Sequence, residues 1–546
     1  MTETHDHPGH GPVFMAAVAL GVVMALLAAW LLWEEFGPET PDPCGPGLRT
    51  TNGECIGVSD GGGKPFMPEL ADVMKRIKEE NDRIDGQPHA TIALMIPMTS
   101  DHKEVRKQIL HEVQGAYIAQ YFANGATRAE KQSGGEHPKI RMVLANPGKD
   151  RKQWRPVADQ LARLAEDKKH NLRTVFGFDL SVRPTAQAIA YLTKEKKIPV
   201  VGGPITGNEF TGYPLFARVA PTNSDQADAL VHFDKTLDLE HAILVKDTRQ
   251  PDPYNESLLQ AYERKLKRSP HEPMPFVSED TDIEGGLSSE FKRMATDICV
   301  LRPQVNTVYF AGRPTHLRQF LNELARNRPC KEESFTVVSG SGASTLYSDA
   351  KLDWNALRGL RGDGGRWKGK VTVLYTSIAH PDAWLGTRPR PPETGGSPGV
   401  VRELAQRLKA PSPVGPIGPS DIYDSRTISV HDSAKTAIAG IRLHAEGKKS
   451  GHIPTLREIG TDWNALRGVH KVDGASGWIC IDNQGNAYNK AVAVVRLDPE
   501  DTSERPVFVG LAWPEKVPPP KGQEGSGACQ IPRSQEASGR GSAASP

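Results

Sequence analysis

Two kinds of apolar pattern alternate along the chain from residue 91 onward. Short continuous apolar runs, typical of buried parallel strands, are separated by stretches with apolar residues at helical spacing. The predicted strands are TIALMIP (from Thr91), KIRMVLAN (from Lys139), RTVFGF (from Arg173), IPVVGG (from Ile198), LFARVA (from Leu215), HAILVKD, VNTVYFAG and ESFTVVSG. Two successive strand–helix series predict an α/β fold with two parallel sheets, each covered by helices on both faces.

The stretches between the strands place their apolar side chains on single helical faces. An amphipathic helix, PELADVMKRIKEENDRI, precedes the first strand. Two further faces are formed by Trp154, Val157, Ala158, Leu161, Leu164 and Ala165, and by Leu317, Phe320, Leu321 and Leu324. These faces predict helices that pack against the sheets.

The N-terminal part has a different pattern. Residues 13–33 carry no charge and are numerous enough to cross a hydrocarbon layer roughly 30 Å thick. No Lys or Arg precedes them, which favours an uncleaved anchor over a secretory signal. We therefore expect a cytoplasmic stub (1–12), a transmembrane helix (13–33) in the lipid bilayer and a Pro/Gly-rich linker (34–66). A polar, disordered tail is expected at 515–546.

The six cysteines suggest where the large domain resides. They lack the paired CxxC spacing of a zinc site, and pairing of neighbours along the chain would join Cys44 to Cys55, Cys299 to Cys330, and Cys480 to Cys529. Such disulfides need an oxidising compartment, so they would place the domain outside the cytoplasm, at the cell membrane as a single-pass protein. Six unpaired thiols are the alternative that the sequence leaves open.

Composition narrows the range of functions. The 67 Lys and Arg nearly balance the 66 Asp and Glu, so no charge excess favours nucleic acid as a partner. The loops that follow the predicted strands are rich in hydroxyl groups and glycine but poor in His, Cys and carboxylate clusters. No phosphate-binding loop or dinucleotide fingerprint occurs in the sequence. We expect a small-molecule cleft between two lobes, without a metal or a cofactor and without catalysis.

Several segments carry a resemblance to a known family. The stretch FGFDLSVRPTAQAIAYLTKEKKIPVVGGPITGNEFTGYPLFARVAPTNSDQADAL resembles the core of the type 1 periplasmic-binding proteins, which include the leucine/isoleucine/valine receptors of ABC importers. Further similar segments are AILVKDTRQPDPYNES, VYFAGRPTHLRQFL, HDSAKTAIAGIRL and GASGWICIDNQGNAYNKAVAVVRL. The likeness spans about residues 90 to 500. It implies a first lobe of 67–220 and 377–481 and a second lobe of 221–376 and 482–514, with crossovers near Pro221, Thr376 and Asp482.

The resemblance also implies ligand-binding positions. Its carboxylate-binding hydroxyl groups correspond to Ser181 and Thr206, and its ligand-contacting tyrosine corresponds to Tyr254. Ser181 can alternatively cap a helix, and Thr206 can close a turn. Thr99, in the loop after the first strand, joins the candidate list.

Two positions depart from the family pattern. Arg313 stands where relatives that bind amino acids have an aromatic residue, and Ser341 stands where they have an acidic residue for the ligand's ammonium group. An arginine in the cleft would favour an acid or phosphate, because an ammonium group would lack a charged partner. The alternative for Arg313 is a solvated arginine at a helix start.

The function expected from this resemblance is extracytoplasmic binding of a small polar or anionic solute by closure of two lobes, followed by docking on an ABC permease or a membrane sensor. A sensory or interaction module with the same fold is one alternative, and an extracytoplasmic hydrolase is another.

One repeat remains unexplained by this function. The heptapeptide DWNALRG occurs at Asp353–Gly359 and again at Asp462–Gly468. We interpret both copies as local packing segments, in which Trp354 and Trp463 cover the edges of the lobes.

Overall fold

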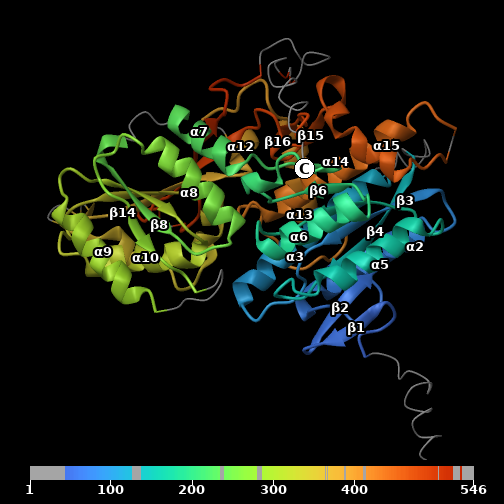
Figure 1. The fold of residues 1–546 in the computed structure, drawn as a ribbon, viewed down its shortest axis with the longest axis horizontal. Helices are drawn as coiled ribbons and strands as arrows, with labels where there is room; N and C mark the ends of the chain where they lie inside the picture. The colour runs from blue at the N-terminus through green and yellow to red at the C-terminus, as the bar shows by residue number, and fades with distance from the viewer. Residues whose placement is uncertain are drawn as a thin grey trace, which may run out of the picture.

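The computed structural model describes residues 43–125, 137–233, 239–279, 286–362, 365, 367–386, 389–409, 414–449, 451–501, 503–519, 529 and 531. Figure 1 shows two lobes side by side, each built around a twisted sheet. The predicted stub and transmembrane segment (1–33) lie outside the described residues. Among the helices that are described, none combines the length and the apolar character needed to cross a bilayer.

The sheet of the first lobe has the strand order β1-β2-β4-β3-β5-β6-β7. Its strands are β1 (Leu48–Thr51), β2 (Glu54–Ser59), β3 (His89–Met95), β4 (Lys139–Asn146), β5 (Leu172–Gly177), β6 (Val200–Gly202) and β7 (Phe216–Arg218). The strands from β4 to β7 are parallel, as predicted, whereas β1 and β2 are antiparallel additions at one edge.

The sheet of the second lobe has the order β18-β17-β14-β11-β10-β8-β9. Its strands are β8 (Ala242–Asp247), β9 (Met274–Phe276), β10 (Thr307–Ala311), β11 (Phe335–Ser339), β14 (Val371–Ser377), β17 (Val492–Leu497) and β18 (Val507–Ala512). β17 and β18 run antiparallel at the edge, so this sheet is mixed as well. The prediction of two α/β lobes is confirmed, with antiparallel strands at one edge of each sheet.

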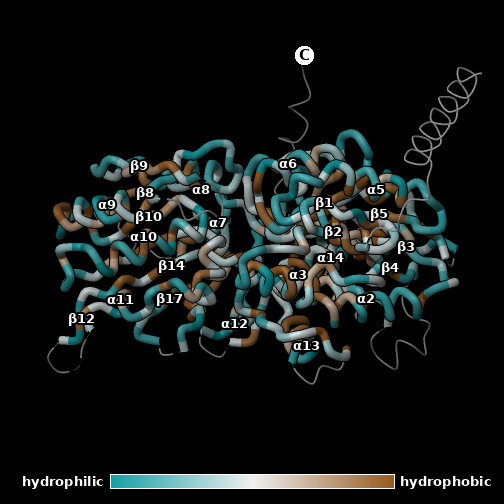
Figure 2. The backbone as a smooth tube through the Cα atoms, turned by 90° about the horizontal axis from the view of Figure 1, so that it is seen from below, coloured by the Kyte–Doolittle hydropathy of each residue, from teal (hydrophilic) through white to brown (hydrophobic). Residues whose placement is uncertain are grey.

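Helices cover both faces of each sheet, and Figure 2 shows apolar segments gathered inside both lobes. In the first lobe, one face packs against α2 (Ala71–Arg83), α3 (Lys103–Ala123) and α14 (Arg426–Ala445), and the other against α5 (Trp154–Glu166) and α6 (Arg183–Ala190). In the second lobe, one face packs against α9 (Ser288–Val300), α10 (Pro314–Asn327) and α11 (Trp354–Arg358). The other face packs against α7 (Asn223–Phe233) and α8 (Pro253–Lys265).

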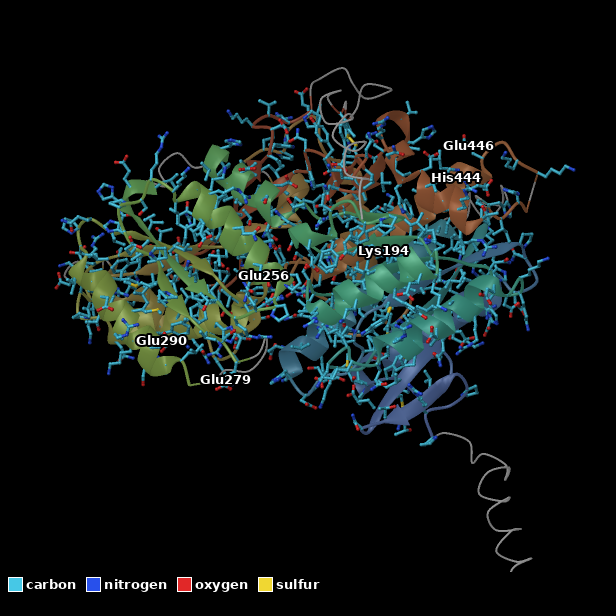
Figure 3. The ribbon with its side chains drawn as sticks, viewed as in Figure 1. Lys194, Glu256, Glu279, Glu290, His444 and Glu446 are labelled. Carbon is cyan, nitrogen blue, oxygen red and sulfur yellow. A yellow bond between two sulfur atoms is a disulfide. The ribbon has the colours of Figure 1, made fainter. Side chains whose placement is uncertain are left out.

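Shorter elements complete the described part. They are α12 (Asp382–Leu385), α13 (Pro398–Leu408), α15 (Leu456–Thr461), β12 (Leu360–Arg361), β13 (Trp367–Lys368), β15 (Val472–Gly474), β16 (Gly477–Ile479), the π-helix η2 (Tyr191–Glu195) and the 3-10 turns η1 (Pro68–Leu70), η3 (Asn208–Phe210), η4 (Leu239–His241), η5 (Ser341–Ser348), η7 (Trp463–Ala465) and η8 (Gly468–His470). Polar side chains project from both lobes in Figure 3, where Lys194 and Glu446 are exposed examples.

The expected linker 34–66 is partly folded, which corrects the prediction. β1 and β2 form a hairpin whose inner strand β2 pairs with β4 of the first sheet, which leaves β1 at the edge. The turn residues Asn52 and Gly53 have φ angles of 51° and 77°, both left-handed, as a type I′ turn requires. An Asn-Gly pair between two strand-like runs is a strong hairpin signal, and the Pro/Gly-rich composition of the segment concealed it.

The three predicted disulfides are present. Cys44 is bonded to Cys55 beside the N-terminal hairpin, and Cys299 to Cys330 at the end of the second lobe's α9. Cys480 is bonded to Cys529, which lies in the expected tail 515–546 and is therefore held to the first lobe at that point.

The repeated heptapeptide folds in two different ways. In the first copy, Asp353 caps α11 by accepting a hydrogen bond of 2.9 Å from the amide of Ala356, and Trp354 is only partly buried. In the second copy, Trp463 is 4% exposed, its ring lies against Gly440 of α14, and its indole nitrogen donates to the carbonyl of Leu215. The second copy therefore depends on a glycine in a neighbouring helix.

Replacing Gly440 with valine should destabilise the first lobe, because any side chain there overlaps the ring of Trp463. We expect a loss of about 1–3 kcal/mol in the free energy of unfolding, measured by urea titration. Gly399→Ala is a matched control, since an added Cβ at this helical position meets nothing within 4 Å. Equal stability of the two variants would contradict this account.

Candidate ligand-binding cleft

Five of the six predicted ligand positions are buried, and the contacts among them join the lobes. Ser181 and Thr206 come from loops that follow β5 and β6 of the first lobe, and Tyr254, Arg313 and Ser341 come from the second. Thr99 does not join them. Its hydroxyl group donates to Glu54 of the N-terminal hairpin, away from the other five positions.

Ser181 holds both lobes together at one point. Its hydroxyl oxygen accepts hydrogen bonds from the amides of Thr206 (3.2 Å) and Gly207 (3.1 Å). Its carbonyl oxygen accepts from Nη2 of Arg313 (2.8 Å) and from the amide of Tyr254 (3.3 Å), which belong to the other lobe. Ser181 is not the N-cap of α6, since that position is Val182. The Ser181 hydroxyl oxygen, expected to bind a ligand carboxylate, is thus already engaged by two amides of the protein.

Tyr254 is enclosed in the same junction. Its phenol oxygen accepts a hydrogen bond of 3.1 Å from the amide of Gly342, and burial raises the pKa of the phenol. The guanidinium carbon of Arg313 lies 4.8 Å from the ring centroid, within cation–π range. Ser341 lies beside Gly342 at the start of η5 and is also buried.

Arg313 is a buried ion-pair partner and not a solvated arginine. It is the N-cap residue of α10 and is 4% exposed. Its Nε and Nη2 donate to the two carboxylate oxygens of Asp252 at 2.9 and 2.6 Å, a bidentate pair. Asp252 is held in place because it caps α8 by accepting from the amide of Asn255. The Asp252 carboxylate therefore neutralises the positive charge of Arg313, which we expected to attract an acidic solute.

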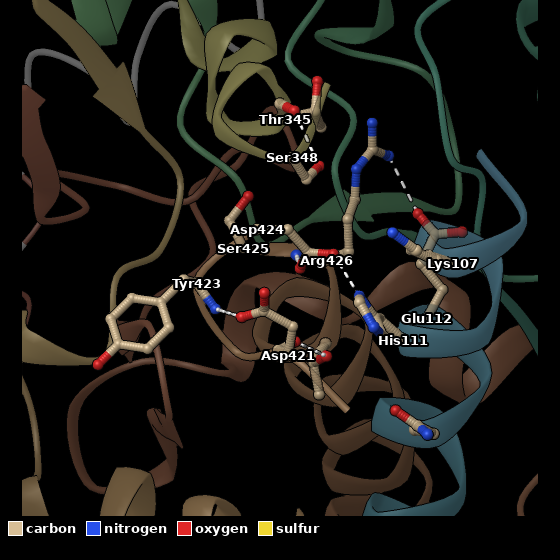
Figure 4. Close-up of polar contacts among 12 residues, drawn as sticks. Lys107, His111, Glu112, Thr345, Ser348, Asp421, Tyr423, Asp424, Ser425 and Arg426 are labelled. Carbon is tan, nitrogen blue, oxygen red and sulfur yellow. Dashed lines mark hydrogen bonds and ion pairs between the residues drawn. The ribbon is translucent and has the colours of Figure 1, made fainter. Parts of the chain in front are cut away.

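A second group of contacts joins the lobes through residues 421–426. Figure 4 shows the neighbourhood of this segment, with Asp424 bonded to His111 and Arg426 bonded to Glu112. The phenol of Tyr347 in η5 donates to Asp421 (2.6 Å), and the hydroxyl group of Ser344 donates to the carbonyl of Asp424 (3.4 Å). Asp424 also bonds His111 of α3 at 2.5 Å, and the carboxylate raises the pKa of His111 against the opposing effect of burial.

A cavity of about 400 Å³ lies next to the Ser181 junction and has walls from both lobes. The first lobe supplies the start of α3, the loop after β5, Arg151 and Arg426, and the second lobe supplies the start of α10 and the end of η5. Of the predicted residues, Arg313 alone lines it. The full lining is Asp101, His102, Lys103, Glu104, Val105, Gln108, Ile109, Glu112, Arg151, Asp179, Leu180, Arg313, Pro314, Thr315, Arg318, Thr345, Leu346, Asp349, Ala350, Lys351 and Arg426.

The wall of this cavity contains an ion pair formed by Glu112 and Arg426. Nη1 of Arg426 donates to Oε1 of Glu112 (3.0 Å) and to the carbonyl of Asp179 (2.8 Å). The two residues meet because α3 and α14 approach closely at Gly115, where a Cβ would clash with the backbone of Thr427. Burial raises the pKa of Glu112 to about 8, although the charge of Arg426 opposes the shift.

Neither Glu112 nor Arg426 was predicted from the sequence. Glu112 shares its helical face with Ile109 and Ala116, a pattern that could have indicated burial, whereas Arg426 follows a polar loop and resembles an ordinary solvated position. In the described residues, no group of three or more His, Cys, Asp or Glu side chains is placed to hold a metal ion.

Replacing Asp252 with asparagine should cost about 3–5 kcal/mol in the free energy of unfolding, because Arg313 would stay buried without its counter-charge. Asparagine can still cap α8, so the loss reports on the ion pair. Combining Asp252→Asn with Arg313→Met should recover most of that loss, as measured by urea titration of both variants. As a control, Asp297→Asn removes an exposed pair with Arg293 and should change the stability by less than about 1 kcal/mol. A double variant as unstable as Asp252→Asn alone would contradict this view of the pair.

Comparison with known proteins supports the fold. No family model and no curated protein matches the sequence. A leucine-binding protein from Thermotoga maritima is similar in structure with a TM-score of 0.53 at 17% identity, covering 78% of this chain and 100% of that one. An amino-acid ABC transporter substrate-binding protein from Pseudomonas fluorescens gives 0.52 at 13% identity (81% and 99% covered). A solute-binding protein from R. palustris in complex with benzoate gives 0.51 at 12% identity (79% and 97% covered). The chain therefore has the two-lobed fold of the type 1 periplasmic-binding receptors.

Proposed function

We propose that this protein is a membrane-anchored, extracytoplasmic receptor that closes its two lobes around a small polar or anionic solute. The observation that carries the proposal is the cavity of about 400 Å³ whose walls come from both lobes. A solute there contacts both lobes only when they are together, so its binding free energy favours the closed form. The fold shared with solute receptors supports this function and gives no support to a hydrolase.

The proposed location has two supports. Residues 13–33 are long and apolar enough for a bilayer span, and the three disulfides suit an oxidising compartment. The first strand of the described residues begins at Leu48, about 14 residues after the end of the expected span. A chain of that length reaches at most roughly 50 Å, which keeps the receptor close to the membrane surface.

A sensory role without transport is the second candidate, and a specific observation favours it. The lobes already contact each other directly, through Arg313 and Tyr254 on the Ser181 carbonyl and through Tyr347 on Asp421. Such contacts between the protein's own residues add to the stability of the form in which the lobes are together, which suits a membrane sensor with a solute-dependent population of states. An ABC permease remains the partner in the first candidate, and co-purification of permease and ATPase subunits with the full chain would support it.

Solute binding in the cavity should be blocked by a bulky side chain at its rim. We expect at least one member of a panel of leucine, succinate, benzoate and glucose to stabilise the full chain in detergent by about 2.7 kcal/mol at a hundredfold excess over its dissociation constant. Ala350→Trp, at the cavity, should abolish this stabilisation in a thermal-shift assay, whereas Ala71→Trp, exposed on α2, should preserve it. If no member of this panel or of a wider panel of polar metabolites stabilises the chain, the receptor function is wrong.

The anchor can be tested in intact cells. The full chain should stay in the membrane fraction after alkaline carbonate extraction, and a protease added outside should digest the large domain. Deleting residues 13–33 should release it from that fraction. Protection of the domain from external protease would place it on the cytoplasmic side and contradict the proposal.

A further inference from the structure

Two guanidinium groups, one from each lobe, bind the same short loop beside the cavity. Arg426 of the first lobe donates to the carbonyl of Asp179, and Arg313 of the second lobe donates to the carbonyl of Ser181, both at 2.8 Å. Residues two apart in a chain are separated by at most about 7 Å. Both arginines line the cavity. The structure thus places two cationic donors, from different lobes, along one side of the space.

The arginines differ in their counter-charges. Arg313 forms a bidentate pair with Asp252, whereas Arg426 contacts a single carboxyl group, that of Glu112. The charged and titratable groups that face Glu112 are Arg426 from α14, Asp179 from the loop after β5, Asp424 from the loop before α14, and its neighbour His111. Burial, together with the negative charges of Asp179 and Asp424, outweighs the effect of Arg426 and raises the pKa of Glu112 to about 8. Near neutral pH, this carboxyl group is largely protonated, which leaves a positive charge on Arg426 without an ionised partner.

The remaining arginines of the cavity add no further unpaired positive charge. Arg151 pairs with Asp179 and Arg318 pairs with Asp349, so each brings its own carboxylate. The N-terminus of α10 adds positive potential to the cavity, as Arg426 does, because Thr315 lies in the first helical turn at the cavity wall. The space therefore offers hydrogen-bond donors from both lobes, whereas the arginine charge without an ionised partner is that of Arg426, because Asp252 neutralises Arg313.

We propose that this cavity binds a carboxylate-bearing solute between Arg313 and Arg426, with the Glu112 carboxyl group setting how tightly the solute is held. The inference rests on the proposed receptor function and names the solute class of that site. A neutral Glu112 leaves Arg426 able to bind the carboxylate, whereas an ionised Glu112 repels it and competes for Arg426. Binding of the solute is therefore coupled to uptake of a proton by Glu112.

The direction of the pH effect distinguishes this site from one that binds an ammonium group. Affinity for a carboxylate should fall as pH rises through the pKa of free Glu112, by up to about tenfold between pH 8 and 9. An ammonium group would instead need Glu112 ionised, so its affinity would rise over the same range. Leucine, succinate and benzoate, measured by titration calorimetry on the full chain in detergent, cover these possibilities.

Three variants test which residues cause the pH dependence of carboxylate binding. Glu112→Gln keeps a polar side chain beside Arg426 but cannot titrate, so its affinity for the carboxylate probe should be equal at pH 8 and 9, with no proton uptake detected in buffers of different ionisation enthalpy. Arg426→Gln should weaken carboxylate binding at pH 7 by tenfold or more. Arg293→Gln is the control, since this arginine is exposed on α9 and should leave affinity unchanged.

The outcomes separate the two proposals. A carboxylate whose affinity falls with pH in the native chain and not in Glu112→Gln supports the inference. Leucine bound in preference to both acids, with affinity that rises with pH, would overturn the carboxylate assignment and leave the receptor function standing. The carboxylate assignment would also be overturned, and the receptor function would stand, if glucose alone bound. The same conclusion would follow if Arg426→Gln bound a carboxylate as tightly as the native chain. Failure of every solute in the wider metabolite panel to bind would overturn both proposals.

Discussion

A guanidinium group buried at the boundary between two lobes must find acceptors on both sides, and this constraint organises the centre of the structure. Arg313 meets it with the Asp252 carboxylate in its own lobe and the Ser181 carbonyl in the other. The carboxylate cancels the charge in a region from which water is largely excluded, and the carbonyl ties the charge-paired arginine to the first lobe. At this point the lobes consequently meet through defined polar contacts, while Phe508 and Leu511 of β18 pack against the apolar cores of both lobes elsewhere.

This arrangement moves the candidate site away from the position that the family resemblance implies. The amides of Thr206 and Gly207 are bonded to the Ser181 hydroxyl oxygen, and the phenol of Tyr254 accepts from the Gly342 amide. Each of these groups therefore already has a hydrogen-bond partner within the protein. The available space lies next to it, where Glu112 and Arg426 form the wall. Their position follows from the close packing of α3 against α14, so the electrostatics of the cavity depend on helix packing as much as on loops.

Much of the fold could be predicted because its patterns are local. Predicted strands such as KIRMVLAN and the helical face that begins at Trp154 match β4 and α5 closely. Neighbour pairing of the cysteines was also predictable, since each disulfide closes a short or moderate loop. The site was predictable only in part. The resemblance located Ser181 and Arg313 at the lobe boundary, but it could not show that Asp252, far away in sequence, neutralises the arginine.

Apolar periodicity in the sequence by itself determined that two α/β lobes form, because burying each apolar face requires a sheet or a helix opposite it. Which polar groups face one another was decided only by the tertiary structure. The heptapeptide DWNALRG demonstrates this, since identical residues begin a helix at Trp354 and a 3-10 turn at Trp463, where Gly440 leaves room for the ring. Glu112 and Arg426 are likewise brought together by helices more than three hundred residues apart in the chain. The physical reason is that burial and Coulomb interactions depend on distance in space, whereas sequence patterns record only separation along the chain.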